Sequence, residues 1–274
     1  MQGPFVNQRT VWQRVRQVLA PLLVALVAFG KWIGAGLKFL LPALKFVLPL
    51  LKTGGTMLIS VAVYAMLWGW QFAAGFVLLL FVHEAGHLLA ARWMGLNVGW
   101  PVFIPFMGAF IALKEAPRNA WIESVVGAGG PLIGGLAAVL VGAVYFITGH
   151  PLFLALGYMG LFLNLFNLIP IVPLDGGRIV SAISPWLWVV GLVIIVPYLV
   201  LRASGTGFVI LLIVLMSVPR VIALFRRRSP EDARYFECTP AQRWTMGLLY
   251  LGMLGGMALT MGLFHDILTG HFGG

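Results

Sequence analysis

The stretch FVLLLFVHEAGHLLAARW, from Phe76 to Trp93, places two histidines and a glutamate inside an otherwise apolar run. Ionisable side chains are costly to bury in hydrocarbon, so they are rare within membrane segments and are usually functional where they occur. The stretch is also close to the roughly 20 residues that a helix needs to cross a bilayer. It therefore predicts a membrane helix whose polar residues have a chemical role.

The rest of the chain is apolar as well. Of its 274 residues, 61% are hydrophobic and 9% are charged, whereas about a quarter of the residues in a soluble domain are charged. The net charge of +10 comes from basic residues clustered at segment ends, such as Arg226 to Arg228. This is the positive-inside pattern of membrane proteins, and it argues against nucleic acid as a partner. The single cysteine, Cys238, excludes an intrachain disulfide.

Apolar segments of membrane-spanning length recur along the chain and predict an all-α polytopic membrane protein with about six to seven transmembrane helices. We expect a basic amphipathic arm over residues 1–52, a catalytic membrane core over 53–180, and C-terminal transmembrane helices over 181–274 with a cytoplasmic loop near 226–241. The candidate spans are residues 56–69, 72–93, 125–148, 152–173, 184–201, 207–225 and 242–265.

The N-terminal arm carries a regular lysine pattern. Lys31, Lys38, Lys45 and Lys52 lie seven residues apart, so on a helix they form a stripe that drifts by about 20° per heptad. If the segment crossed the bilayer, each central lysine would cost roughly 2.5–3.5 kcal/mol. An amphipathic helix on the membrane surface avoids that cost and is our prediction. A signal peptide or signal anchor is the alternative, because an arginine-rich start precedes an apolar run.

The segment WPVFIPFMGAFIALK, from Trp100 to Lys114, is too short to cross the membrane as a helix and is interrupted by Pro101, Pro105 and Gly108. It predicts a β-hairpin near residues 102–113. Non-helical backbone persists at membrane depth only where protein covers it or where it lines a wet cavity. Its apolar side chains therefore favour a membrane-associated hairpin beside the helices over a surface loop.

The motif HEAGH places His83 and His87 four residues apart. On a helix they share a face and lie about 6 Å apart along the axis, a spacing that allows both imidazoles to bind one zinc ion. Glu84 projects roughly 100° away from His83, close enough to act on a water molecule at the metal without being a ligand itself. This arrangement is the histidine pair and general base of zinc metalloproteases.

A catalytic zinc usually has three protein ligands, and Asp175 is our candidate for the third. It lies at the end of the 152–173 span, after Pro170 and Pro173. If the spans alternate in direction, this span and the HEAGH span both end at the cytoplasmic side, so their polar residues meet at similar depth. Capping of the next helix or pairing with Arg178 is the alternative role. The other acidic residues outside HEAGH lie in loops or near the chain end: Glu115, Glu123, Glu231, Asp232, Glu237 and Asp266.

The combination of HEAGH with the later segment NLIPIVPLDGG resembles the site-2 protease family of intramembrane zinc metalloproteases. That family has His-Glu-x-x-His followed by Asn-x-x-Pro-x-x-Pro-x-Asp-Gly, and the residues that match the second pattern are Asn167, Pro170, Pro173, Asp175 and Gly176. The resemblance covers about residues 72–180 and includes the small-residue segment GGPLIGG, from Gly129 to Gly135.

The resemblance implies hydrolysis of peptide bonds within or next to transmembrane segments of membrane-protein substrates. It implies one Zn²⁺ per chain, held by His83, His87 and Asp175, with Glu84 as the general base. Asn167 would steady the oxyanion or the substrate backbone; an interhelical hydrogen bond is its alternative role, and Asn164 one turn earlier offers the same chemistry. We expect a multi-pass protein of the bacterial inner membrane whose active site lies nearer the cytoplasmic side, with the oligomeric state left open.

Two other functions compete with proteolysis. Transporters and channels also bury histidines and acidic residues, but here the buried charge converges on one cluster and forms no ladder across the bilayer. A catalytically inactive, metal-stabilised membrane scaffold is the second rival. Glu84 argues against it, because a structural zinc site has no need of a general base.

Overall fold

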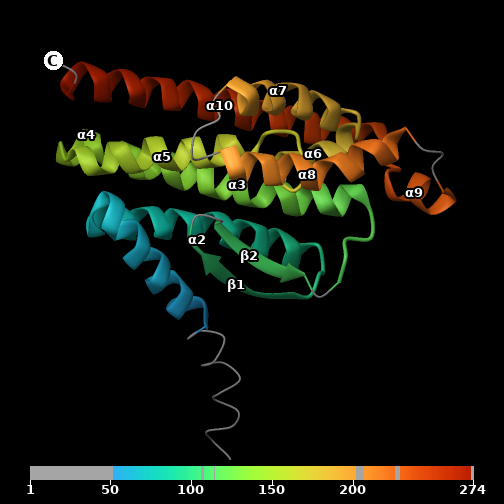
Figure 1. Ribbon diagram of the computed structural model, residues 1–274, viewed down its shortest axis with the longest axis horizontal. Helices are drawn as coiled ribbons and strands as arrows, with labels where there is room; N and C mark the ends of the chain where they lie inside the picture. The colour runs from blue at the N-terminus through green and yellow to red at the C-terminus, as the bar shows by residue number, and fades with distance from the viewer. Residues whose placement is uncertain (1–51, 106–107, 114, 202–206, 226–228, 273–274) are drawn as a thin grey trace, which may run out of the picture. The chain divides into compact units, whose positions relative to one another are not determined.

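The computed structural model describes residues 52–105, 108–113, 115–201, 207–225 and 229–272 (Figure 1). The predicted N-terminal amphipathic helix, apart from its last residue, lies outside these described residues.

The described chain is mostly helical. A first helix over residues 52–68 is followed by α2 (Trp70–Trp93), two strands and then the remaining helices. The strands are β1 (Val98–Ile104) and β2 (Gly108–Leu113). The later helices are α3 (Ala120–Ala143), α4 (Tyr145–Thr148), α5 (Pro151–Asn167), α6 (Asp175–Ile183), α7 (Leu187–Leu201), α8 (Gly207–Leu224), α9 (Pro230–Tyr235) and α10 (Pro240–Phe272).

Three helices of the described chain are long and apolar enough to cross a membrane: Trp70–Trp93, Ala120–Thr148 and Pro240–Gly270. The apolar helices Pro151–Asn167, Leu187–Pro197 and Ile210–Leu224 are shorter. By this criterion of length and composition, fewer helices qualify than the six to seven that hydropathy predicts.

The predicted span over residues 152–173 is longer than the observed helix, because α5 already ends at Asn167. Pro170 and Pro173 lack the N–H that a continuing helix would donate, and each disfavours helical backbone in the residue before it. The chain therefore leaves the helix six residues earlier than hydropathy alone predicts.

The two strands pair in antiparallel fashion, with Pro101 opposite Ile111 and Phe103 opposite Ala109. β1 begins at Val98, ahead of the predicted 102. Its other edge meets the first helix, where the Thr53 hydroxyl donates to the Pro101 carbonyl at 2.7 Å and the Phe103 N–H donates to the Thr56 hydroxyl at 3.2 Å. These bonds attach β1 to the helix bundle, while the association of the hairpin with a membrane stays a prediction.

Close packing of α2 against α3 depends on glycines. A methyl group at Gly86 would overlap the carbonyl of Gly129, and a methyl group at Gly129 would lie 2.5 Å from the carbonyl of Gly86. Small residues at such positions let helix backbones approach closely, which is how membrane helices gain van der Waals contact. On its other side α3 packs against α5 and α6, and α10 packs over all three (Figure 1).

The segment between α5 and α6 and the first turn of α6 are both held by the C-terminal helices. The Tyr250 hydroxyl of α10 donates to the Leu168 carbonyl at 2.7 Å, and the Trp188 indole N–H of α7 donates to the Gly177 carbonyl at 2.7 Å. A methyl group at Gly176 would overlap the same Leu168 carbonyl. The start of α6 is therefore fixed by residues that lie outside the 72–180 region of the family resemblance.

Tyr250→Phe tests this support. The substitution leaves the buried Leu168 carbonyl without its hydroxyl partner, and we expect a loss of about 1–3 kcal/mol in the free energy of unfolding. The measurement is denaturant unfolding of the purified protein in detergent. Tyr158→Phe is the matched control, because the Tyr158 hydroxyl has no hydrogen-bond partner among the described residues. Equal stabilities of the two variants would contradict the prediction.

Candidate metal centre

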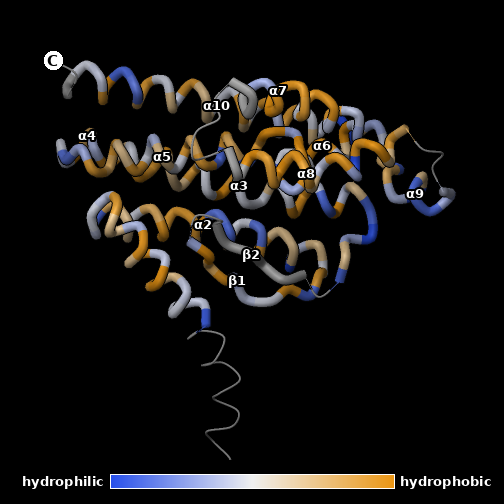
Figure 2. Tube along the Cα trace, in the orientation of Figure 1, coloured by the Kyte–Doolittle hydropathy of each residue, from blue (hydrophilic) through white to orange (hydrophobic). Residues whose placement is uncertain are grey.

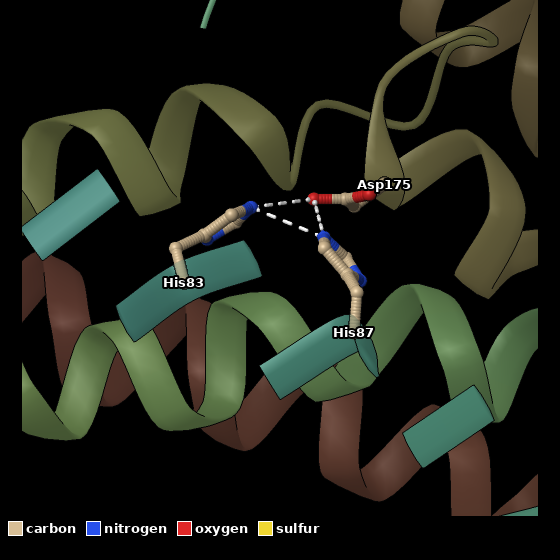
Figure 3. A group of neighbouring side chains, drawn as sticks. All are labelled: His83, His87 and Asp175. Atoms are coloured by element: carbon tan, nitrogen blue, oxygen red, sulfur yellow. Dashed lines mark hydrogen bonds and ion pairs between the residues drawn. The ribbon is translucent and has the colours of Figure 1, made fainter. Parts of the chain in front are cut away.

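His83 and His87 of α2 meet Asp175, the first residue of α6, inside the helix bundle (Figure 3). The two Nε2 atoms lie 3.1 Å apart. Oδ2 of Asp175 lies 3.2 Å from Nε2 of His83 and 3.1 Å from Nε2 of His87. The three residues are 3%, 7% and 8% exposed. Three ligand atoms from two distant parts of the chain thus converge in a buried place.

This triangle fits a zinc ion. Zinc takes nitrogen and oxygen ligands at about 2.0–2.2 Å in a tetrahedral arrangement, so its ligand atoms lie about 3.3 Å from one another. The observed separations of 3.1–3.2 Å are close to that value. Two histidines and one carboxylate are also a ligand set of catalytic zinc sites, which keep a fourth position open. Among the described residues, this is the group of histidines and acids close enough to hold a metal ion.

Each imidazole is held from behind by a hydrogen bond at Nδ1. Nδ1 of His87 donates to the Val126 carbonyl of α3 at 2.7 Å, and Nδ1 of His83 lies 2.8 Å from Oδ1 of Asn164 on α5. Metal-binding histidines usually donate their second ring N–H to such acceptors, which fixes the ring and its tautomer. With the protons on Nδ1, both Nε2 lone pairs point into the triangle.

Glu84 follows His83 on α2 and is 8% exposed. Its carboxylate makes no hydrogen bond or ion pair with any residue that the structure describes, although it lies within electrostatic reach of His83, His87 and Asp175. It is not a member of the three-ligand group. A buried carboxylate that is near the ligands but not engaged is available to accept a proton.

The two asparagines of α5 have different positions. Asn167 is the last residue of the helix, is partly buried, and its side chain has no hydrogen-bond partner among the described residues. Asn164 is 2% exposed and contacts His83. The family pattern includes Asn167 but not Asn164, so motif comparison alone misses this contact. The sequence signal for this contact is that Asn164 offers a second amide group one helical turn before Asn167.

The GGPLIGG segment lies in α3 and makes room for the site. A methyl group at Gly130 would overlap the imidazole of His87, and one at Gly134 would lie 2.7 Å from Oδ1 of Asn164 and 3.0 Å from Cβ of His83. These glycines therefore form the wall against which the two histidines lie. The small-residue spacing that the sequence shows has a direct role in shaping the metal group.

Asp175 also has a cationic neighbour. The second oxygen of Asp175, Oδ1, lies 3.9 Å from a guanidinium nitrogen of Arg178, so the residue faces both the histidines and a cation.

At the start of α3, Glu123 accepts a hydrogen bond from the Tyr235 hydroxyl at 2.5 Å. Burial and this carboxylate raise the pKa of Tyr235. Burial also raises the pKa of the Cys238 thiol, which therefore stays protonated at neutral pH.

Gly130→Ala tests the glycine wall. The added methyl group displaces the His87 ring, so we expect the zinc content of the purified protein to fall well below one ion per chain. Gly252→Ala is the matched control, because a methyl group there meets no atom within 4 Å. Both substitutions favour helix by up to about 1 kcal/mol, so a difference in metal content reports on the site. Full zinc content in Gly130→Ala would contradict the prediction.

Comparison with known proteins agrees with the geometry. The family model of peptidase family M50 matches residues 71–156 and 148–189. A zinc metalloprotease of Methanocaldococcus jannaschii is 32% identical over 130 residues, which cover 46% of this chain and 37% of that protein. A presumed zinc metalloprotease of Synechocystis sp. is 31% identical over 136 residues, which cover 48% of this chain and 34% of that protein.

The chain thus spans about a third of the length of the curated relatives that it matches. The matched region contains α2, α3, α5 and α6, which are the helices that carry the metal group and its supports. Over residues 71–189 the chain is thus similar to peptidase family M50, the site-2 protease family.

Proposed function

We propose that this protein is an intramembrane zinc metalloprotease that hydrolyses peptide bonds within or next to transmembrane segments of membrane-protein substrates. The observation that carries the proposal is the buried triangle of His83, His87 and Asp175 with the unengaged carboxylate of Glu84 beside it. A ligand set with a neighbouring free base is what metal-assisted hydrolysis needs. The match of residues 71–189 to the model of peptidase family M50 supports the same reaction.

The residues have distinct roles in this reaction. His83, His87 and Asp175 would hold zinc, which when bound acts as a Lewis acid toward water and the scissile carbonyl. Glu84 accepts the proton of the attacking water and then donates it to the leaving amine as the peptide bond breaks. The hydrogen bonds at Nδ1 keep both imidazoles in place while this proton moves.

The substrate has to expose a peptide bond. A transmembrane helix uses its own amide groups in internal hydrogen bonds, so a segment must unwind before cleavage and needs new partners for its backbone. A β-strand edge offers such partners. Because Thr53 and Thr56 already bond to the outer edge of β1, we expect an opened substrate to pair with β2. The free amide of Asn167 is a further candidate contact for the substrate backbone or the oxyanion.

We also propose the membrane arrangement. The three shorter apolar helices α5, α7 and α8 would cross or enter the bilayer together with the three longer ones, giving about six to seven spans with the first helix.

Hydrophilic residues gather before α3 and at α9, beyond the apolar helices (Figure 2). Arg92 lies little more than one turn beyond His87 on α2. By the positive-inside rule, this arginine supports a metal group nearer the cytoplasmic side, and the bacterial inner membrane remains our expectation.

Removal of a ligand tests the metal assignment. Each of His83→Ala, His87→Ala and Asp175→Ala deletes one of three protein ligands, so we expect about one zinc per chain in the parent protein and a strong reduction in each variant. Metal analysis of the purified proteins is the measurement. Parent-like zinc in Asp175→Ala would mean that the third ligand lies elsewhere in the chain.

Glu84→Gln tests the mechanism. The substitution keeps the size of the side chain but removes its ability to accept a proton at neutral pH, so the variant should keep its zinc and its fold while losing hydrolysis. General acid–base catalysis typically contributes about 10²–10⁴-fold to the rate. The assay follows cleavage of a panel of single-pass membrane helices in detergent, with and without a chelator.

The same variant separates proteolysis from its rivals. A transporter or an inactive scaffold has no hydrolysis to lose and should behave as the parent protein does. Cleavage by zinc-loaded Glu84→Gln at the parent rate would refute the role of Glu84 as the base.

A further inference from the structure

Asn164 is a buried amide that contacts one metal-site histidine from a different helix. It projects from α5, is 2% exposed, and its Oδ1 lies 2.8 Å from Nδ1 of His83. Its position beside Gly134 is tight, since a methyl group on that glycine would lie 2.7 Å from Oδ1. The amide therefore has little freedom to move away from the imidazole.

The orientation of this amide is fixed by a second hydrogen bond. Nδ2 of Asn164 donates to the Gly160 carbonyl, one turn earlier on α5, at 2.7 Å. A carbonyl accepts and does not donate, so the nitrogen of the amide faces Gly160 and the oxygen faces His83. An amide oxygen also accepts only, and Nδ1 of His83 must therefore carry a proton for this contact to be favourable.

The alternative tautomer of His83 has its own partner. With the proton on Nε2, the ring could donate to Oδ2 of Asp175, which lies 3.2 Å away. That state uses the nitrogen that a metal needs, and it leaves the Nδ1 lone pair facing the Asn164 oxygen at 2.8 Å. Two acceptors that face each other in a buried place are unfavourable. Asn164 thus counteracts the tautomer that Asp175 would otherwise favour.

The two histidines differ in how they are supported. Nδ1 of His87 bonds to the backbone carbonyl of Val126, which any residue at that position would supply. Nδ1 of His83 bonds to a side chain. Among the described residues, Asn164 is the side chain outside the ligand group that hydrogen-bonds to one of these imidazoles.

We propose that Asn164 is a positioning residue that holds His83 in the Nδ1–H tautomer and so keeps its Nε2 ready to bind zinc. The inference rests on the proposed zinc site, but not on the proteolysis proposed for it. Helix α5 then supports the site in two ways. It supplies Asn164 to His83, and it leads into the segment that ends at Asp175.

The first test needs no substitution at Asn164. In the metal-free full chain labelled with ¹⁵N-histidine, the nitrogen shifts of His83, assigned by loss of its signals in His83→Gln, report which ring nitrogen carries a proton. We expect a protonated Nδ1. A bare Nδ1 on His83 would overturn the proposal, whatever the stability of any Asn164 variant.

The second test measures zinc affinity by competition with a chelator. Asn164→Ala removes the acceptor and should lower the affinity by about 10–100-fold, the usual effect of losing such a partner. Asn164→Asp keeps an acceptor oxygen at the same place and should recover most of the loss. Ser217→Ala is the control. It deletes the hydrogen bond from the buried Ser217 side chain to the Val214 carbonyl, 2.8 Å long on α8, and should bind zinc as the parent does.

Parent-like zinc affinity in Asn164→Ala would overturn the proposal, as would an equal loss in Asn164→Ala and Asn164→Asp. Both tests read the tautomer or the affinity and not cleavage. A protein that binds zinc as expected but cleaves no substrate would therefore refute the proposed protease and leave this inference intact.

Discussion

The close approach of α2 to α3 is the contact on which the metal group depends. Gly86 and Gly129 let the two backbones meet without side chains between them. That approach brings the Val126 carbonyl within hydrogen-bond distance of His87 and places Gly130 directly against its ring. In hydrocarbon, helices gain little from burying apolar side chains, so packing and hydrogen bonds of this kind supply most of their association.

The second constraint is that a carboxylate has to reach the same point from another part of the chain. The early end of α5 at Asn167 and the new start of α6 at Asp175 supply it. Non-helical backbone inside a membrane protein needs partners for its polar groups, and the Tyr250 hydroxyl provides one for Leu168. The Trp188 indole bonds to Gly177 in the first turn of α6. The C-terminal helices are therefore part of the metal site's support even though they contribute no ligand.

The sequence predicts the parts of this protein that depend on local pattern. The helix that carries HEAGH needs only apolar length and spacing, and Asp175 emerges because few acidic residues lie at span ends. The contacts of Asn164, Tyr250 and Trp188 depend on which helices become neighbours, and each links residues that are distant or unpatterned in sequence. The predicted and observed ends of α5 differ for a related reason. The apolar sequence continues past Pro170, whereas the helical backbone hydrogen bonds end before it.

The buried polar groups of the site differ in one respect that bears on function. His83, His87, Asp175 and Asn164 all have hydrogen-bond or ionic partners, whereas the Glu84 carboxylate has none among the described residues. An acidic group with charges nearby but no hydrogen bond or ion pair is costly to bury inside a membrane protein. A scaffold that used the metal only for stability would gain from a neutral residue there. The cost is understandable if the carboxylate is kept free to receive a proton, which favours catalysis over a purely structural metal site.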